Sequence, residues 1–202
     1  IKELKIISCH LGNGSSLTAV KNGKSIDTSL GFGTISGVIM GTRCGDVDPA
    51  VIPYLMDKEG LDFEKMNDIL YKESGFIGLS EGISSDKRDL EEKAEQGDKR
   101  AHRTLNVLHY GLKKYIGAYT AAMNGLDVLI FTAGIGENSP MLRKDVCNEL
   151  SYLGIKIDEK KNEVRGKLTD ISAEDSNVKV LVIPTNEELM IARDTVEICN
   201  NL

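Results

Sequence analysis

Several short segments combine glycines with polar or charged side chains in patterns that suit the binding of phosphate groups. The first is His10–Ser16, in which Gly12 and Gly14 flank Asn13, and Ser15 follows. Glycines without a Cβ let backbone amides approach phosphate oxygens, and the Asn and Ser side chains add neutral donors. The alternative interpretation is a plain hairpin turn, for which Asn and Gly are also typical.

A second segment, Met40–Pro49, places Arg43 on a loop between two glycines. A guanidinium group there can offer paired hydrogen bonds to a phosphoryl group or a carboxylate. The alternative is an ordinary surface arginine. We expect Asp48 to cap a helix whose first position is Pro49, and Asp46 to support either Arg43 or the loop.

The third segment, Phe131–Pro140, takes a predicted buried strand through two glycines to a predicted helix start at Ser139. Free amides and the positive end of a helix dipole would then meet at the carboxyl edge of a sheet, which suits a nucleotide. Gly134, Gly136 and Asn138 have no other evident purpose. The dinucleotide-binding fingerprint fails, because Ser139 stands where its third glycine belongs.

Two further segments carry weaker signals. In Ile183–Leu189, Thr185 and Glu188 form a predicted capping box, which leaves Glu187 as a carboxylate that could hold Mg²⁺ directly or through water. Asp86–Arg88 is a charged triplet that is more typical of a helix start than of a binding site.

The elements that must position these segments follow from turn signals and apolar periodicity. Strands are predicted over Leu4–Leu11, Ser16–Lys21, Lys24–Leu30, Asp127–Thr132, Gly154–Ile157 and Lys179–Ile183. Helices are predicted from Asp48 and over Asp62–Ser74, Asp86–Glu95, Lys99–Met123, Ser139 to about Leu153, and Thr185–Cys199, with Phe76–Glu81 irregular. This order predicts one α/β domain with a mixed sheet and flanking helices.

Composition excludes some functions. The chain has 202 residues, 41% of them hydrophobic, and a net charge of −6, so we expect no nucleic-acid partner. Its longest apolar stretch, Val128–Ile135, is far short of the roughly 20 residues that cross a membrane. The four cysteines lack metal-site spacing, which favours reduced thiols and a cytoplasmic location. Because the chain starts at Ile1 within apolar sequence, we expect a piece of a longer protein.

Together and in this order, the five segments resemble the signature motifs of the acetate kinase family. The similarity covers essentially all 202 residues. The matching segments are His10–Ser16 (HLGNGSS), Gly31–Asp48 (MGTR followed by GDVD), Asp86–Arg88 (D-x-R), Gly134–Asn138 (within AGIGEN) and Pro184–Glu188 (PTNEE).

This resemblance implies the fold of the acetate and sugar kinase, Hsp70 and actin superfamily, which is ribonuclease H-like. Residues 1–202 would be a single C-terminal, nucleotide-binding domain, with the N-terminal domain absent. The implied reaction is reversible, Mg²⁺- or Mn²⁺-dependent transfer of the γ-phosphoryl group of ATP to acetate, giving ADP and acetyl phosphate. The resemblance also implies a homodimer through this half, and an isolated fragment that does not turn over acetate.

The resemblance assigns roles residue by residue. Arg43 and His10 would act in catalysis, Asn13, Gly14 and Ser15 would bind phosphate, and Glu187 would bind Mg²⁺. The nucleotide would be lined by Asp86, Arg88, Gly134, Ile135, Gly136 and Asn138. Alternatives are a propionate or other short-chain acyl kinase of the same family, a nucleotide-binding module without catalysis, and a dimerisation module.

Overall fold

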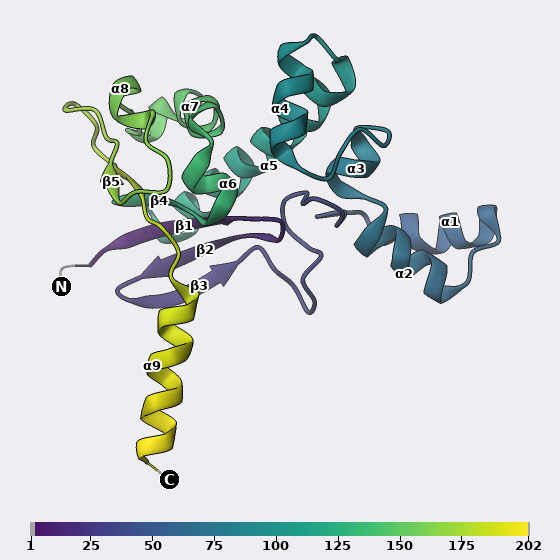
Figure 1. Ribbon diagram of the computed structural model, residues 1–202, viewed down its shortest axis with the longest axis horizontal. Coiled ribbons are helices and arrows are strands. Elements are labelled where there is room, and N and C mark those ends of the chain that lie inside the picture. The colour runs from purple at the N-terminus through teal and green to yellow at the C-terminus, as the bar shows by residue number, and fades with distance from the viewer. Residues whose placement is uncertain (1–2, 202) are drawn as a thin grey trace.

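The computed structural model describes residues 3–201 and is built on a six-stranded mixed sheet in the order β3-β2-β1-β4-β6-β5 (Figure 1). The strands are β1 (Lys5–Leu11), β2 (Ser15–Lys21), β3 (Lys24–Thr28), β4 (Val128–Thr132), β5 (Thr169–Asp170) and β6 (Lys179–Val182). β1, β4 and β6 run parallel, whereas β2, β3 and β5 pair antiparallel to their neighbours. The predicted fold class, a mixed α/β sheet with flanking helices, is confirmed.

The helices include all those expected from the sequence. They are α1 (Val51–Glu59), α2 (Phe63–Lys72), α3 (Gly75–Leu79), α4 (Lys87–Glu95), α5 (Lys99–Met123), α6 (Ala133–Asn138), α7 (Pro140–Asn148), a 3₁₀ turn (Ser151–Leu153), α8 (Glu159–Asn162) and α9 (Glu187–Asn200). Helices α3, α6 and α8 are not among those predicted. The α1–α2 hairpin extends to one side of the sheet, and α9 stands away from it (Figure 1). Within the described residues, no helix is both long and apolar enough to cross a membrane.

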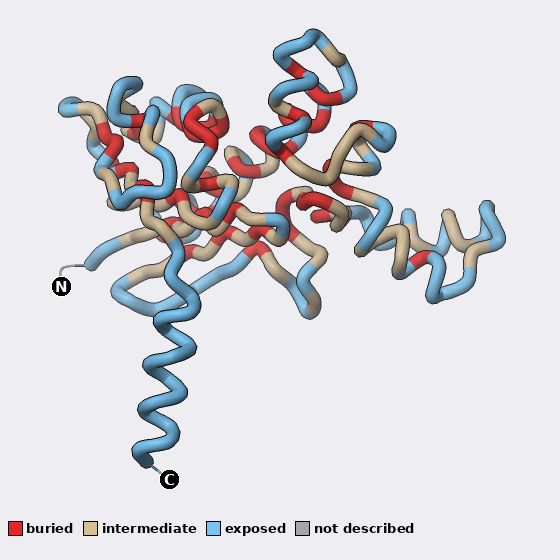
Figure 2. The backbone as a smooth tube through the Cα atoms, in the orientation of Figure 1, coloured by how far each residue is buried: buried red, intermediate tan, exposed pale blue. Residues whose placement is uncertain are grey.

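The core lies between the central strands and α5. Leu112 and Ile116 on α5 are fully buried, as are Ile7, Leu17 and Phe131 on β1, β2 and β4 (Figure 2). α5 begins after Asp98, whose carboxylate accepts hydrogen bonds from two backbone amides of the first turn. Apolar residues at helical spacing therefore give this helix the buried face that the sequence predicts.

Three of the predicted elements differ in the structure. The helix predicted from Ser139 to about Leu153 ends at Asn148, and a separate 3₁₀ turn follows it. Gly154–Ile157 is not a strand, because only Ile157 pairs, through an isolated bridge to Ser172. Phe76–Glu81 is not wholly irregular, since Gly75–Leu79 forms the short helix α3. Its amides bond to a distant loop, a partner that local sequence cannot report.

Helix starts also differ by one or two residues from the predictions. Helix α1 begins at Val51, and the Asp48 carboxylate caps the preceding turn through the Ala50 amide at 2.9 Å. For α9 the capping side chain is Asn186, which accepts from the Leu189 amide, and not Thr185. The Thr185 hydroxyl is instead bonded to Thr132 at 2.7 Å, so a contact across the sheet takes precedence over the local cap.

His109 provides a test of how burial affects stability. It lies on α5 with 6% of its surface exposed, and its Nε2 atom has no hydrogen-bond partner. Burial, aided by the charges of Lys87 and Lys113, lowers the pKa of His109 to about 4. The nearest carboxylate, on Asp145, lies 3.3 Å from Nδ1, but burial raises its own pKa.

We therefore expect acid to destabilise the fold through His109. In the unfolded chain His109 becomes protonated below pH 6.5, whereas in the folded state it stays neutral down to about pH 4. The free energy of unfolding should fall by on the order of 2 to 3 kcal/mol across that interval. Urea unfolding at pH 7 and pH 4.5 measures this loss, and His109→Gln should reduce it. If His109→Gln loses as much unfolding free energy between pH 7 and pH 4.5 as the unmodified protein, the loss does not come from His109.

Candidate active site

A cleft of about 520 Å³ opens where β1 and β4 end. Because these strands are parallel, the segments that follow them meet at one edge of the sheet. Gly12 lies close to Ala133, with 3.7 Å between the Ala133 Cβ atom and the place where a Cβ on Gly12 would stand. The cleft is lined by Gly12, Asn13, Phe76, Ser85, Asp86, Lys87, Arg88, Glu91, Gly134, Ile135, Asn138, Ser139 and Arg165. It thus brings together six of the predicted site residues: Asn13, Asp86, Arg88, Gly134, Ile135 and Asn138.

The turn after β1 is closed by its own hydrogen bonds. The Gly12 amide donates to the Gly14 carbonyl at 3.0 Å, and the buried Ser15 hydroxyl donates to the Gly12 carbonyl at 3.2 Å. Ser15 is therefore placed to hold the turn and does not line the cleft. The exposed Asn13 side chain lies over Gly41, where a Cβ would stand only 2.3 Å from the Asn13 Oδ1 atom. Gly41 thus leaves room for the Asn13 side chain at the cleft.

Arg43 is carried beside this turn by a loop that the segment after α2 holds in place. The Phe76 amide donates to the Met40 carbonyl at 2.8 Å, and the Ser74 amide to the Thr42 carbonyl at 3.0 Å. The Arg43 Nη1 atom lies 3.1 Å from where a Cβ on Gly14 would stand, and it donates to a backbone carbonyl at 3.2 Å.

Arg43 has no carboxylate within 4 Å in the part of the chain that the structure describes. Asp46 supports the loop and not this arginine, since it accepts from the Gly37 amide at 2.8 Å and from the Tyr115 hydroxyl at 2.6 Å. The guanidinium group is therefore free to meet an anion beside the turn, although it lies outside the lining of the 520 Å³ cleft.

The opposite wall differs from the predicted open glycine loop, because β4 passes straight into helix α6. Ala133 makes this sharp change with a φ of 63°, in the region that favours glycine. Gly134 faces open space, with nothing within 4 Å of where its Cβ would stand. Gly136 instead packs on the sheet, because a Cβ there would stand 3.3 Å from the Phe131 carbonyl carbon, and it does not line the cleft. The Asn138 amide group donates to the Gly134 carbonyl at 2.9 Å, which braces this wall.

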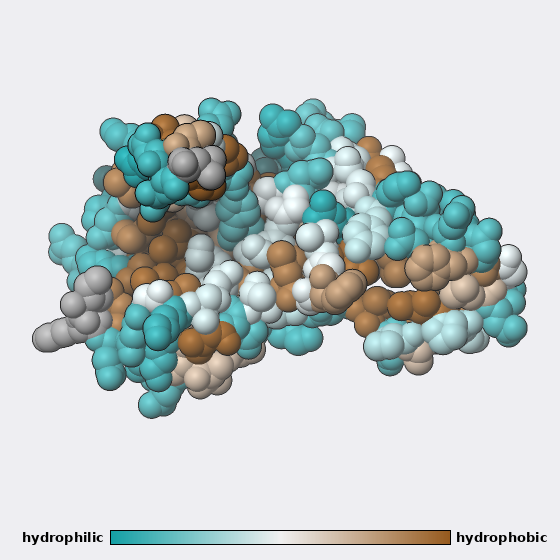
Figure 3. Space-filling model, turned by 90° about the horizontal axis from the view of Figure 1, so that it is seen from below, coloured by the Kyte–Doolittle hydropathy of each residue, from teal (hydrophilic) through white to brown (hydrophobic). Residues whose placement is uncertain are grey.

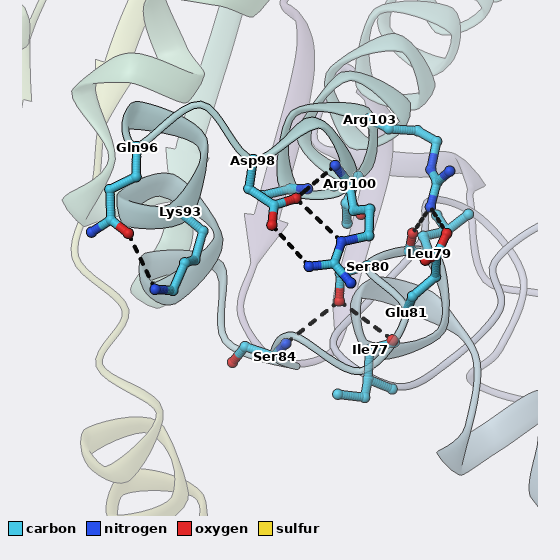
Figure 4. A network of polar contacts seen from close by, with 12 residues as sticks. Ile77, Leu79, Ser80, Glu81, Ser84, Lys93, Gln96, Asp98, Arg100 and Arg103 are labelled. Atoms are coloured by element: carbon cyan, nitrogen blue, oxygen red, sulfur yellow. Dashed lines mark hydrogen bonds and ion pairs between the residues drawn. The ribbon is translucent and has the colours of Figure 1, made fainter.

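Asp86 caps helix α4 and holds Arg88 at the cleft. Its carboxylate accepts from the Arg88 amide at 2.9 Å and pairs with the Arg88 guanidinium group at 2.6 Å. These hydrogen bonds hold the pKa of Asp86 below its usual range. The preceding segment is tied to α5 by Arg103, which donates to the Leu79 carbonyl at 2.6 Å and to Glu81 at 2.9 Å (Figure 4).

His10 and Glu187 meet outside the cleft lining. Their closest atoms, Nε2 and Oε1, are 3.9 Å apart, and Glu187 stands at the first position of α9. Residues 3–201 hold no cluster of three or more His, Cys, Asp and Glu side chains that could ligate a metal. A single carboxylate still fits Mg²⁺, which often binds proteins through one or two carboxylates together with substrate phosphates and water.

The sequence motifs did not reveal a hydrogen-bond network among three residues that line the cleft, Lys87, Glu91 and Ser139. Lys87 is 3% exposed, pairs with Glu91 one turn along α4, and donates to the Ser139 hydroxyl at 2.9 Å. The Ser139 hydroxyl in turn donates to Glu91 at 2.7 Å, so the network joins α4 to the start of α7. Burial lowers the pKa of Lys87. The four-residue spacing of Lys87 and Glu91 was the available signal, but it does not reveal Ser139. Also missed were Phe76, Ser85 and Arg165.

Comparison with known proteins identifies the family of this chain. The sequence profile of the Acetokinase family matches residues 1–193. Acetate kinase of Thermotoga petrophila is 58% identical over all of this chain and 51% of its own length. The crystal structure of Porphyromonas gingivalis acetate kinase superposes with a TM-score of 0.93 at 47% identity, over 98% of this chain and 49% of that one. The crystal structure of a propionate kinase from Francisella tularensis superposes with a TM-score of 0.87 at 39% sequence identity, over 95% of this chain and 48% of that one. The chain thus spans about half the length of these relatives and belongs to the Acetokinase family, as its motifs predict.

Proposed function

We propose that this chain is the nucleotide-binding, C-terminal half of an enzyme that transfers the γ-phosphoryl group of ATP to acetate. The observation that carries the proposal is convergence on one cleft: the turn at Asn13 and the wall at Gly134–Asn138 face the same space. Arg43 stands beside that turn. Acetate is proposed as the substrate because the similar proteins are named acetate kinase. The reverse reaction would give ATP and acetate from ADP and acetyl phosphate.

Little covalent chemistry falls to the protein in such a transfer, so positioning and charge stabilisation dominate. In this proposal, Asn13 and Gly14 hold the β- and γ-phosphates on a turn that Ser15 braces. Arg43 offsets the charge of the phosphoryl group in flight, with His10 close to the same end. Mg²⁺ held through Glu187 would neutralise phosphate oxygens.

The nucleoside would occupy the other part of the cleft. Ile135 and Asn138 line it from α6, and Asp86 and Arg88 line it from the start of α4. The proposed contribution of Gly136 is indirect, because its missing side chain lets α6 lie against β4. Each of these residues is held by hydrogen bonds or packing before any ligand binds, which lowers the cost of binding.

We further propose that the active enzyme needs a second, N-terminal half. None of the α9 residues is buried, and the backbone of this helix carries the colour of exposed residues along its length (Figure 2). The exposed apolar residues of α9 are Leu189, Met190, Ile191, Val196 and Ile198. With the site open on that side, the isolated chain should bind nucleotide weakly and fail to turn over acetate, and acetate turnover by the purified 202-residue chain would contradict this.

Self-association through this half is part of the same proposal. Apolar side chains lie open over α1 and α2, among them Tyr54 and Phe63 with exposed fractions of 60% and 77% (Figure 3). Sedimentation velocity on the chain would report a dimer mass, and a purely monomeric chain at high concentration would contradict it.

Propionate is the alternative acceptor, favoured by the likeness to the Francisella tularensis propionate kinase. The two carboxylates differ by one methylene, which an apolar pocket distinguishes by about 1 to 3 kcal/mol. The ratio of kcat/KM for acetate and propionate in the full-length enzyme decides between them.

Calorimetric titration of the full-length enzyme with Mg-ADP tests whether the nucleotide binds beside Gly134. A valine at Gly134 would extend into open cleft without a clash at Cβ, so Gly134→Val should fold and abolish binding. Gly117→Ala is a suitable control, because its new Cβ would meet only the Tyr152 hydroxyl at 3.7 Å, away from the cleft. Unchanged binding in Gly134→Val would contradict the assignment, and absence of binding by the unmodified full-length enzyme would contradict the proposed function.

A further inference from the structure

Arg165 differs from the other cations of the cleft in having no acidic partner. Lys87 pairs with Glu91, and Arg88 pairs with Asp86. For Arg165, no carboxylate lies within 4 Å among residues 3–201, and the guanidinium group donates only to the Asn138 carbonyl, at 2.5 Å. An exposed arginine at the wall of a cleft therefore keeps most of its five N–H donors and both faces of its plane unused.

The backbone on both sides of Arg165 is anchored. The preceding Val164 carbonyl accepts a hydrogen bond of 2.7 Å from the fully buried Arg143, and the following Gly166 amide donates to the Glu137 carbonyl at 3.3 Å. Gly166 turns the chain with a φ of 55°. Arg143 also donates to the Gly136 carbonyl at 2.7 Å, so the loop and the end of α6 share one set of contacts. Arg165 is thus placed at the cleft by the fold, and is not the tip of a free loop.

The position of Arg165 is at the end of the cleft away from the phosphate-type turn. A second cavity, of about 310 Å³, shares Glu91, Asn138, Ser139 and Arg165 with the first. Neither Gly12 nor Asn13 lines that second cavity. Arg165 therefore stands at the junction of the two cavities, opposite the end that holds the glycine turn.

We propose that Arg165 is a nucleotide-binding residue that stacks its guanidinium plane on the base. This inference rests on the proposed function, which puts phosphates at the Asn13 turn and so leaves the base for the far end. A planar guanidinium group stacks well on aromatic faces and is less strongly hydrated than an ammonium group. Held by the Asn138 carbonyl, it needs little ordering to cover a ring that enters the cleft.

Kinetics of the full-length enzyme with ATP, and with tripolyphosphate as a competing inhibitor, test this contact. Arg165→Ala should raise the KM for ATP about tenfold, the loss of one cation–π contact, and leave kcat within about twofold. The inhibition constant of tripolyphosphate, which has no base, should not change. Arg165→Lys keeps the charge but loses the plane, and should restore little of the affinity.

Several results would overturn the proposal. If Arg165→Ala weakens the binding of tripolyphosphate as much as that of ATP, Arg165 contacts phosphate and not the base. The same conclusion follows if Arg165→Lys restores full affinity for ATP. An unchanged KM for ATP in Arg165→Ala means that the residue does not touch the nucleotide. Lys144→Ala is a matched control, since Lys144 lines only the second cavity and pairs with Glu159. Failure of the unmodified enzyme to use ATP at all would refute the proposed function instead.

Discussion

Replacing Arg43 with alanine is expected to lower the kcat of the full-length enzyme by a factor on the order of 10³ or more, as when an arginine that stabilises a transferring phosphoryl group is removed. The structure shows why the charge of Arg43 is available at this turn. Arg43 has no carboxylate within 4 Å in the described part of the chain, and it lies beside Gly14 of the turn. Within residues 3–201 no acidic side chain neutralises its charge, which leaves the guanidinium group available to a phosphoryl group.

Steady-state rates in both directions measure this effect, with Mg-ADP binding as a second readout. Binding should weaken far less than kcat falls, because the charge matters most in the transition state. Arg43→Lys should recover only part of the rate, since an ammonium group cannot make the paired contacts. Arg100→Ala, which removes a surface arginine paired with Asp98, is the control and should change little. A loss below tenfold in Arg43→Ala would make Arg43 a structural residue.

Gly75→Ala is the second change for which we expect a large effect, although Gly75 lies outside the cleft lining. A Cβ there would stand 2.1 Å from the Met40 carbonyl oxygen and 2.7 Å from that of Arg43. Both are backbone atoms, so the loop that carries Arg43 must move. With a φ of 60°, alanine also adopts the left-handed region, at a cost of roughly 1–2 kcal/mol. Including the forced shift, we expect a loss of about 3 kcal/mol or more in the free energy of unfolding.

Gly82→Ala separates the two contributions to this loss. Gly82 has a φ of 85°, but nothing lies within 4 Å of where its Cβ would stand. It should therefore show the backbone cost alone, about 1–2 kcal/mol, with activity retained. Chemical unfolding and kcat are measured on both variants. Equal destabilisation of the two, or full activity in Gly75→Ala, would show that the loop does not depend on this close approach.

The sequence by itself determined most of the elements and predicted the chemical character of the site. Short-range rules suffice for these features. Asn22 and Gly23 join β2 to β3 with φ values of 55° and 77°, as a tight hairpin turn requires. The apolar spacing over Lys99–Met123 predicts the longest helix, α5. The glycine-rich segments after β1 and β4 indicate a phosphate or nucleotide site, because parallel strands bring their carboxyl ends to the same edge.

Only the tertiary structure decided which of these residues share the cleft and what holds them. Ser139 meets Lys87 across 52 positions in the chain, and Gly75 meets the Met40 loop through backbone atoms. Arg165 reaches the cleft from a loop whose sequence carries no local signal. Gly136 looks equivalent to Gly134 in the motif, yet one packs on the sheet and the other faces open space. Turns, caps and periodicity depend on neighbours within a few residues, whereas burial and long-range hydrogen bonds exist only after the chain has packed.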